Sequence, residues 1–171
     1  NQDFHDLREL GTKLIMQKPN EEIRSILVEL EQEQHSIQRE WQAKDNWLKQ
    51  CKDLMILNQE ADHLDTITNS HQTYLEFDDL GTNLDDVIAL RKRHDNFIAT
   101  LVAQDDRLHL FNEMAEKLIS AGHYNSANIE IRRKQVIDKR NNVKEIALQR
   151  AEDLKAARAY QEFKAEADEF I

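Results

Sequence analysis

The sequence contains very few residues that interrupt a helix. Its 171 residues include only three glycines and one proline, far fewer than the connections of a compact α/β fold usually require. Hydrophobic residues make up 40% of the chain and charged residues 33%, the mixture expected when each helix has a narrow apolar stripe and a wide hydrated face. The composition therefore predicts an all-α protein of long helices.

Cysteine and long apolar runs are scarce as well. Cys51 is the single cysteine, so an internal disulfide is excluded, which fits a reducing compartment. No apolar run approaches the ~20 residues that span a bilayer, and the first residues lack the hydrophobic core of a signal peptide. These absences predict a cytoplasmic protein without membrane insertion.

The net charge of the chain is strongly negative. A formal charge of -10 argues against nucleic acid as a partner, because phosphate binding needs clustered Lys and Arg. The local exception is a basic run formed by Arg132, Arg133, Lys134, Lys139 and Arg140. We interpret this run as a hydrated helix face opposite an acidic neighbour. The alternative is a patch for an anionic lipid or protein, which would give weak peripheral lipid contact.

Three short segments are predicted to separate the helices. They are Pro19-Asn20, residues 78–83 around Gly81, and residues 121–126 around Gly122. Glycine ends helices because it adopts positive φ without strain, and all three glycines are interpreted as isolated helix terminators rather than as a phosphate-binding loop. Side chains suited to cap the helices that follow are Asn20, Thr82 or Asn83, and Ser126.

The stretch between Asn20 and Leu80 contains no Gly or Pro. A helix over this whole stretch would be on the order of 85 Å long at about 1.5 Å per residue, which is too long for one globular core. We therefore expect it to pass from one helical bundle into another.

Apolar residues recur at heptad spacing in three stretches of the second half of the chain. The middle stretch has the clearest pattern, with Val87, Leu90, His94, Phe97, Leu101, Gln104, Leu108, Phe111, Ala115 and Leu118 at a and d positions. The stretch before it offers Leu57, Ala61, Leu64, Ile67, His71 and Leu75, and the stretch after it Ile129, Val136, Val143, Ile146, Leu154, Ala157 and Tyr160. Three such stripes predict a left-handed three-helix bundle.

The chain also contains an internal repeat of about 106 residues. This shift aligns Ile23 with Ile129, Leu30 with Val136, Ile37 with Val143, Leu48 with Leu154 and Ala61 with Ala167. Before the preceding loop the shift is 104, which aligns Leu14-Ile15 with Leu118-Ile119. Self-similarity at a fixed spacing indicates an array of repeats rather than a single core.

The repeat sets the expected domain boundaries. Because Asn1 aligns with Asp105, midway along the middle helix of the second copy, we expect a fragment of a longer rod. Residues 1–56 would form a partial repeat, made of the end of a second helix and a third helix. Residues 57–171 would form a complete repeat with helices at about 57–78, 83–121 and 126–171. One continuous helix would join the two, and the partial repeat would leave an apolar stripe uncovered.

The loops and helices of this pattern resemble the spectrin repeat family. Asp79-Leu80-Gly81-Thr82-Asn83-Leu84 looks like the family's loop between its first two helices, and Leu90-Arg91-Lys92-Arg93-His94-Asp95-Asn96-Phe97 is similar to the signature of its second helix. Lys117-Leu118-Ile119 with Gly122-His123-Tyr124, followed by Ile129, Arg133, Arg150, Leu154 and Phe163, resembles the second loop and third helix. The repeat length is more similar to that of spectrin itself than to that of α-actinin, dystrophin or plakins. Whether the chain is of the α or the β type stays open.

Two aromatic anchors of the family are missing. The family usually has a Trp in the first helix, where this chain has Thr66-Ile67, and another in the third helix, where the second copy has Arg140 and the first has Gln34. Trp41 and Trp47 lie nearby in the first copy. Because a buried Trp contributes a large apolar area, we expect a softer core and a lower stability of this repeat.

The resemblance implies a structural role and no enzyme activity. Repeats joined by continuous helices form a long, flexible spacer between actin-binding ends. The expected function is therefore a structural spacer of a spectrin-type rod in the membrane-associated actin cytoskeleton at the cell cortex, giving length, elasticity and a lateral docking surface. The alternative is a specific docking module for an adaptor such as ankyrin or for the antiparallel partner spectrin chain. The actin network would be reached indirectly.

Side chains with catalytic or metal-binding chemistry form no recognisable constellation. His94 is interpreted as a core histidine rather than a ligand or pH sensor. Glu60-Ala61-Asp62-His63 is a single Glu-x-x-His unit, whereas a di-iron bundle needs two. Cys51 aligns with Ala157 and is interpreted as a buried small hydrophobe. The other histidines considered, none with a second His at metal-binding spacing on its helix, are His63, His71, His109 and His123. We therefore expect no catalytic, cofactor-binding or metal-binding residues and no cofactor.

Overall fold

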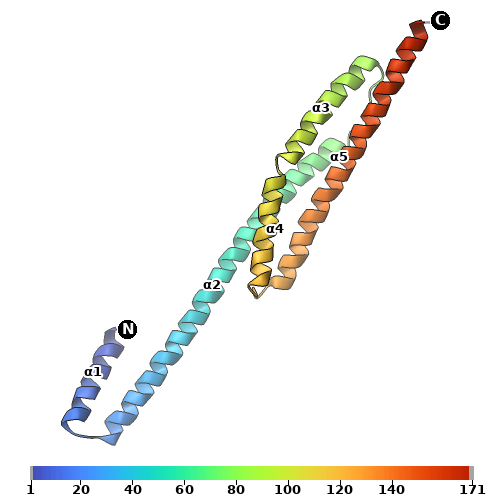
Figure 1. Cartoon of the computed structure of the whole chain (residues 1–171). Coiled ribbons are helices and arrows are strands. Elements are labelled where there is room, and N and C mark those ends of the chain that lie inside the picture. The colour runs from blue at the N-terminus through green and yellow to red at the C-terminus, as the bar shows by residue number, and fades with distance from the viewer. Residues whose placement is uncertain (1, 170–171) are drawn as a thin grey trace. The chain divides into compact units, whose positions relative to one another are not determined.

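The computed structural model describes residues 2–169, which form five α-helices and no strand. In chain order these are α1 (Gln2–Gln17), α2 (Glu21–Leu75), α3 (Leu84–Val102), α4 (Asp105–Ser120) and α5 (Ser126–Glu169) (Figure 1). The predicted all-α class is confirmed. Three residues assigned to the predicted helices, namely Asn1, Phe170 and Ile171, lie outside the described residues.

The chain divides into two compact units. The first unit is Asn1–Lys52 and the second unit is Asp53–Ile171. Helix α2 supplies residues to both units, because it is helical without interruption from Glu21 to Leu75. It ends a few residues earlier than the predicted boundary near residue 78.

Two of the predicted N-caps are present in the structure. The side-chain oxygen of Asn20 accepts a hydrogen bond from the N–H of Glu22 at 2.8 Å. The side-chain oxygen of Asn83 accepts one from the N–H of Asp86 at 2.9 Å. Each bond satisfies a backbone donor that a helix N-terminus would otherwise leave unpaired.

The N-terminus of α5 differs from the prediction. The carbonyl of Asn125 accepts the first helical hydrogen bond, from the N–H of Ile129 at 3.1 Å, so Asn125 rather than Ser126 is the N-cap residue. The Ser126 hydroxyl instead donates to the carbonyl of His123 at 2.5 Å. Ser126 therefore stabilises the turn before the helix.

Two of the three glycines occupy the predicted helix ends. Gly81 and Gly122 have φ values of 84° and 71°, a region in which a residue with a Cβ is strained. Gly11 does not end a helix as predicted, since it is buried within α1. A Cβ on Gly11 would lie 2.7 Å from Cδ2 of Leu27, so the missing side chain lets α1 approach α2.

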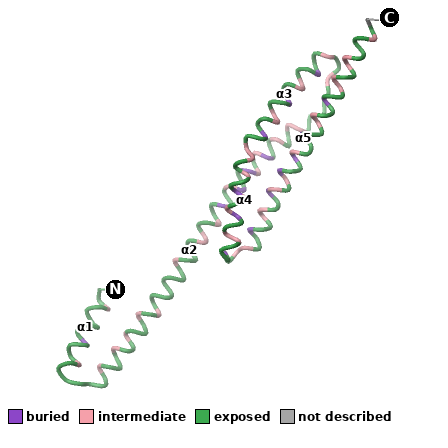
Figure 2. The backbone as a smooth tube through the Cα atoms, in the orientation of Figure 1, coloured by how far each residue is buried: buried purple, intermediate pink, exposed green. Residues whose placement is uncertain are grey.

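The first unit consists of α1 and residues 21–52 of α2. Besides the Gly11 contact, Arg8 of α1 and Glu31 of α2 form an ion pair at 3.7 Å. Most side chains of this unit are exposed (Figure 2). They include large apolar ones: Leu7, Leu10, Leu14, Ile26, Ile37, Trp41, Trp47 and Leu48. The first unit therefore has little buried core of its own.

The second unit is a three-helix bundle, as predicted. Its three layers are residues 53–75 of α2, the α3 and α4 pair, and α5 (Figure 1). The first core cluster consists of Leu57, Ala61, Leu64, Phe111, Ala115, Ile129 and Val136. The second core cluster consists of Leu101, Val143 and Ala147, with Leu75 and Phe97 packed against it. All ten heptad positions predicted for the middle stretch are buried or half-buried.

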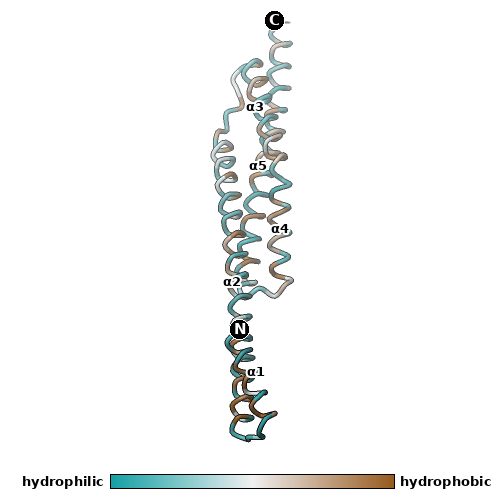
Figure 3. The backbone as a smooth tube through the Cα atoms, turned by 90° about the vertical axis from the view of Figure 1, so that its left-hand side faces the viewer, coloured by the Kyte–Doolittle hydropathy of each residue, from teal (hydrophilic) through white to brown (hydrophobic). Residues whose placement is uncertain are grey.

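The apolar stripes on α2 and α5 depart from the predicted heptad at single positions. Ile146 is 41% exposed and the adjacent Ala147 is buried instead, and Tyr160 is also exposed. On α2, Thr68 is buried beside the half-buried Ile67. Such shifts arise because an α-helix drifts relative to a strict seven-residue repeat. Apolar and hydrophilic positions alternate along every helix (Figure 3).

The predicted middle helix at 83–121 is interrupted. Helix α3 ends at Val102 and α4 begins at Asp105. At this break, the carbonyl of Leu101 accepts a hydrogen bond from the N–H of Gln104 at 3.2 Å and another from Nη2 of Arg140 at 2.7 Å. A side chain that inserts into the helical hydrogen-bond ladder is a known cause of such breaks. The interruption therefore follows from a buried arginine on α5.

Candidate functional site

The most unusual feature of the second unit is an arginine in its core. Arg140 lies on the buried stripe of α5 between Val136 and Val143 and is only 4% exposed. Its Nη1 donates to Nδ1 of His71 on α2 at 2.8 Å, and its Nη2 donates to the carbonyl of Leu101 at 2.7 Å. Arg140 thus ties α2 and the end of α3 to α5. Because both acceptors are neutral, the buried charge is hydrogen-bonded but not paired.

The proton positions of this pair follow from the chemistry of arginine. A guanidinium only donates hydrogen bonds, so Nδ1 of His71 must present its lone pair and neutral His71 carries its proton on Nε2. Burial lowers the pKa of His71 from its ordinary value of 6.5, and the charge of Arg140 lowers this pKa further. Burial also lowers the pKa of Arg140, while the nearby charge of Asp105 acts in the opposite direction.

His71 belongs to a group of aromatic rings from α2 and α3. The ring of Phe97 lies edge-on to His71 with centroids 5.4 Å apart, and Tyr74 stacks on Phe97 at 4.2 Å. His94 completes the group, 5.7 Å from Phe97. Edge-to-face and offset stacks of this kind are favourable arrangements for aromatic pairs. Phe97, which contacts the other three rings, also packs against the second core cluster.

The prediction that His94 is a core histidine is confirmed. His94 is 1% exposed, and its Nε2 lies 2.8 Å from the carbonyl of Ala147 on α5. Since a carbonyl only accepts, Nε2 carries the proton in neutral His94. Within residues 2–169, the buried Nδ1 of His94 has no hydrogen-bond partner.

Further polar atoms are buried at the break between α3 and α4. Asp105 accepts a hydrogen bond from Nζ of Lys144 on α5 at 2.8 Å. In the part of the chain that the structure describes, the buried oxygens Oε1 of Gln104 and Oδ1 of Asp105 have no partner. Buried polar groups that lack partners lower stability, so we expect this part of the bundle to be softer than the first core cluster.

Glu60, the carboxylate of the Glu-x-x-His unit, forms an ion pair with Arg107. Glu60 accepts two hydrogen bonds from Arg107 on α4, one from Nε and one from Nη2, the latter at 3.0 Å. The hydrogen bond from Arg107 lowers the pKa of the Glu60 carboxyl. His63 is exposed. Across residues 2–169 there is no group of three or more His, Cys, Asp or Glu side chains that could hold a metal ion.

The remaining candidates from the sequence are Cys51, His109 and His123. Cys51 is half-buried on α2. His109 is exposed with Nε2 3.2 Å from Glu113, and His123 is buried, its Nδ1 accepting from the N–H of Asn125 at 3.0 Å. We define the Arg140 cluster as Arg140, His71, Tyr74, His94 and Phe97. Among the described residues, it contains two of the histidines considered, His71 and His94.

The basic run lies mostly opposite acidic side chains, as predicted. Arg132 pairs with Asp62 at 2.7 Å and with Asp65 at 2.8 Å. Lys139 lies 3.8 Å from Asp65. On another side of α5, Arg133 pairs with Glu116 of α4 at 3.0 Å and with Glu130 of its own helix at 2.7 Å. Arg140 contradicts the interpretation, because it is buried in the core.

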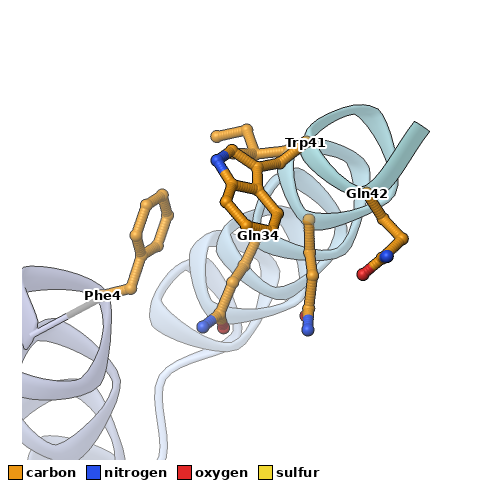
Figure 4. Close-up of a pocket in the computed structure, with 6 residues that line it drawn as sticks. Phe4, Gln34, Trp41 and Gln42 are labelled. Atoms are coloured by element: carbon orange, nitrogen blue, oxygen red, sulfur yellow. The ribbon is translucent and has the colours of Figure 1, made fainter. Parts of the chain in front are cut away.

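A hollow of about 460 Å³ lies in the first unit. It is lined by Phe4 of α1 and by Gln34, Ile37, Gln38, Trp41 and Gln42 of α2. In Figure 4, the rings of Phe4 and Trp41 rise from different helices at the mouth of this hollow. Trp41 remains 67% exposed, so the hollow is an open surface of mixed apolar and amide side chains rather than an enclosed cavity.

Comparison with known proteins identifies the family. The model of the spectrin repeat matches residues 52–156, which is more than half of the chain. The chain belongs to the spectrin repeat family. The match begins beside the first residue of the second unit, Asp53, and covers all three layers of the bundle.

Several proteins similar to this chain are named spectrin alpha or beta chains, and they are far longer than this chain. The erythrocytic spectrin alpha chain 1 of Mus musculus is 27% identical over 150 residues, which cover 88% of this chain and 6% of the mouse protein. The spectrin beta chain of Drosophila melanogaster is 23% identical over 174 residues, covering 98% of this chain and 8% of that protein. The non-erythrocytic spectrin beta chain 5 of Homo sapiens is 24% identical over 104 residues, covering 61% and 3%. The chain thus spans less than a tenth of each relative.

The burial of Arg140 in this spectrin repeat, and its hydrogen bonds to α2 and α3, were not predicted from the sequence. The sequence indicated that Arg140 stands where the family usually has Trp, but the same residue was assigned to a hydrated basic run. Arg140 precedes Ala147 and Leu154 at intervals of seven residues, and both of these side chains are buried. That spacing was the available signal that the guanidinium lies inside the bundle.

Among the described residues, no helix has the length and hydropathy needed to cross a membrane.

Proposed function

We propose that this chain is a spacer segment of a spectrin-type rod in the membrane-associated actin cytoskeleton of the cell cortex. Membership of the spectrin repeat family and similarity to spectrin alpha and beta chains support this proposal. The observation that carries it is the uninterrupted helix α2, which belongs to both units. A helix without a Pro or Gly hinge transmits order from one repeat to the next.

The two units correspond in this proposal to one complete repeat and to part of another. The second unit supplies the complete three-helix bundle, and the first unit supplies the elements that the internal repeat aligns with α4 and α5. The boundary proposed from the sequence, between residues 56 and 57, lies a few residues after the division at Lys52 and Asp53.

Elasticity would come from the uneven core of the second unit. The first core cluster is apolar, whereas the region around Arg140 contains buried polar atoms that have no partner among residues 2–169. Partial opening of an unevenly stabilised structure costs less free energy than global unfolding. Such a bundle would lengthen under load by opening first around Arg140 and would close again when the load is removed.

We also propose that the chain acts without catalysis. The carboxylate of Glu60 is held by Arg107, and the carboxylates of Asp62 and Asp65 pair with Arg132. Carboxylates held by ion pairs stay ionised and make poor general acids at neutral pH.

Repeated stretching of single molecules tests the spacer function. The full chain would be held by its two ends in optical tweezers and cycled between low and high force. We expect extension through discrete steps and complete recovery of the starting length over many cycles. A chain that fails to recover after the first cycles would contradict an elastic spacer.

A second candidate function, lateral docking, is favoured by the exposed apolar stripe of the first unit. The internal repeat aligns Ile37 with Val143 and Trp41 with Ala147. Val143 and Ala147 are buried in the second unit, whereas Ile37 is 52% and Trp41 67% exposed. The stripe therefore has the residues of a bundle core without the helix that would cover them.

The second unit indicates what would cover this stripe. There, α2 contributes Leu57, Ala61 and Leu64 to the core that α5 and α4 share. We therefore propose that the occupant is an amphipathic helix with apolar residues at this spacing, supplied by a paired spectrin-type chain. An adaptor such as ankyrin is the alternative occupant.

Tryptophan fluorescence tests the docking candidate. The two Trp residues, Trp41 and Trp47, both lie in the first unit. A synthetic peptide of residues 53–75 is expected to shift their emission to shorter wavelength, because docking removes the indoles from water. The matched control peptide carries Leu57→Lys and Leu64→Lys and should have no effect. An equal shift with both peptides, or no shift with either, would reject the helix as occupant.

A further inference from the structure

The hydrogen bond between Arg140 and His71 lies between the two core clusters. On α5, Arg140 separates Val136 of the first cluster from Val143 of the second. On α2, His71 lies between Leu64 of the first cluster and Leu75, which packs against the second. Loss of this hydrogen bond would therefore weaken the packing of α2 against α5 between the two core clusters.

The bond can form only while His71 is neutral. Nδ1 of His71 lies 2.8 Å from Nη1 of Arg140 and accepts the hydrogen bond with its lone pair. Once His71 is protonated, Nδ1 carries a hydrogen and no longer accepts. Two cations would then face each other at hydrogen-bond distance in a half-buried site, where their repulsion is stronger than in water.

The neighbouring groups offer little compensation for a second charge. The titratable side chains around this site are Tyr74 on α2, His94 on α3, Asp105 at the start of α4, and Arg140 and Lys144 on α5. Asp105 is the carboxylate among them, and Lys144 already pairs with it at 2.8 Å. In residues 2–169, His71 forms no ion pair with a carboxylate.

We propose that His71 and Arg140 form a pH-sensitive joint in the second unit, in which protonation of His71 releases Arg140 and loosens α2 and α5 at the α3–α4 break. The joint is a property of this bundle alone, and it operates whether or not the chain is a cytoskeletal spacer. A mildly acidic environment would then soften the repeat without unfolding its first core cluster.

The direction of the pH effect follows from linkage. Burial and the charge of Arg140 lower the pKa of His71 in the folded protein, so the unfolded chain takes up the proton first as the pH falls. Stability therefore decreases as the pH falls below about 6.5, the ordinary histidine value. Glu9, Glu60 and Glu130 have pKa values lowered from 4.5, so these carboxylates stay ionised in the same window.

Hydrogen exchange at two pH values tests the joint in the full chain. Exchange in residues 64–75 and 136–147 would be followed at about pH 7.5 and pH 5.5, after correction for intrinsic exchange rates. We expect the opening equilibrium constant of these segments to rise by up to about tenfold at the lower pH, the limit reached if His71 stays neutral in the folded state.

Two substitutions assign this rise to His71. His71→Gln keeps an acceptor for Arg140 but cannot take up a proton, and it should remove most of the pH-dependent rise. His63→Gln is the matched control, because His63 is an exposed residue on the same helix, and it should leave the rise unchanged. An unchanged rise in His71→Gln would overturn the proposal.

A titration of the unmodified chain tests the pH-sensitive joint even if His71→Gln does not fold. The imidazole signals of His71 would be followed by NMR from about pH 8 to pH 5, a range around the ordinary histidine pKa. The joint requires His71 to titrate below the ordinary value. A measured pKa at or above that value would overturn the proposal.

Discussion

Gly81 and Gly122 both adopt positive φ, but their surroundings differ. A Cβ on Gly81 would lie 2.9 Å from the backbone nitrogen of Val87, whereas a Cβ on Gly122 would meet nothing within 4 Å. The first glycine is therefore required by both backbone conformation and space, and the second by conformation alone.

Alanine substitutions should separate these two requirements. Gly122→Ala should cost about 1 kcal/mol from left-handed strain, and Gly81→Ala about 2 kcal/mol or more, because the clash with backbone adds to the same strain. Urea unfolding followed by circular dichroism measures both. A Gly122→Ala variant that is the less stable of the two would contradict this explanation.

Arg140 offers a second test at the residue scale. Arg140→Ala should cost about 2–3 kcal/mol, because the packed stem of the side chain leaves a cavity. Arg140→Met keeps the volume and removes the buried charge, so its stability should lie within about 1 kcal/mol of the parent or above it.

Urea unfolding of both Arg140 variants measures the difference. If Met is as destabilising as Ala, the hydrogen bonds to His71 and Leu101 contribute more than the burial of the charge costs, and the description of a soft core would be wrong.

Single residues were predictable where the cause is local. Asn20 and Asn83 were recognised as caps because an N-cap depends on a few neighbouring residues. Gly11 was misinterpreted because its role depends on Leu27, a residue on another helix. Arg140 was misassigned for the same reason, since its acceptors, His71 and Leu101, lie on two other helices.

At the scale of helices, the ion pair between Glu60 and Arg107 fastens α2 to α4. Hydrogen bonds from Arg107 lower the pKa of Glu60 below 4.5, so its contribution to stability is present above that pH and is lost as the pH falls further. The pair lies at the surface, with 24% of the Glu60 side chain and 45% of the Arg107 side chain exposed. Its contribution should be about 0.5–1 kcal/mol.

Glu60→Gln should therefore reduce stability by that amount at pH 7 and flatten the loss of stability below about pH 4.5. Thermal unfolding from pH 7 to pH 3 measures both effects. Glu145→Gln, the same change at an exposed residue of α5, serves as the control and should follow the parent. A Glu60→Gln curve that parallels the parent would show that the ion pair does not contribute.

The helices themselves could largely be predicted from the sequence, because their starts and apolar stripes depend on local spacing. The break between α3 and α4 could not. Residues 102–105 contain neither Gly nor Pro, and the heptad continues through Gln104 to Leu108 without a gap. The cause is the Arg140 guanidinium, which reaches the Leu101 carbonyl from α5.

At the scale of the whole molecule, the internal repeat and the resemblance to spectrin repeats predicted the three-helix bundle before its contacts were known. The internal repeat is a similarity between two segments of the sequence, so it can be recognised without knowledge of tertiary contacts. The Arg140 cluster departs from the family pattern, so the resemblance indicated its position but not its partners.

At the level of the whole chain, we expect α2 to couple the two units. The first unit has little buried core, so its part of α2 should be helical mainly because the helix continues into the second unit. Lys52→Pro, an exposed change at the division between the units, removes one helical hydrogen bond and costs about 3 kcal/mol in a helix interior. Lys52→Ala controls for the lost charge, and Glu21→Pro, at the first position of α2, for proline itself.

Hydrogen exchange of residues 30–50 is the measurement that tests this coupling most directly. We expect Lys52→Pro to reduce the protection of these amides strongly, and Lys52→Ala and Glu21→Pro to leave it close to that of the parent. Protection that survives in Lys52→Pro would show that the first unit is ordered by itself, and it would contradict coupling through α2.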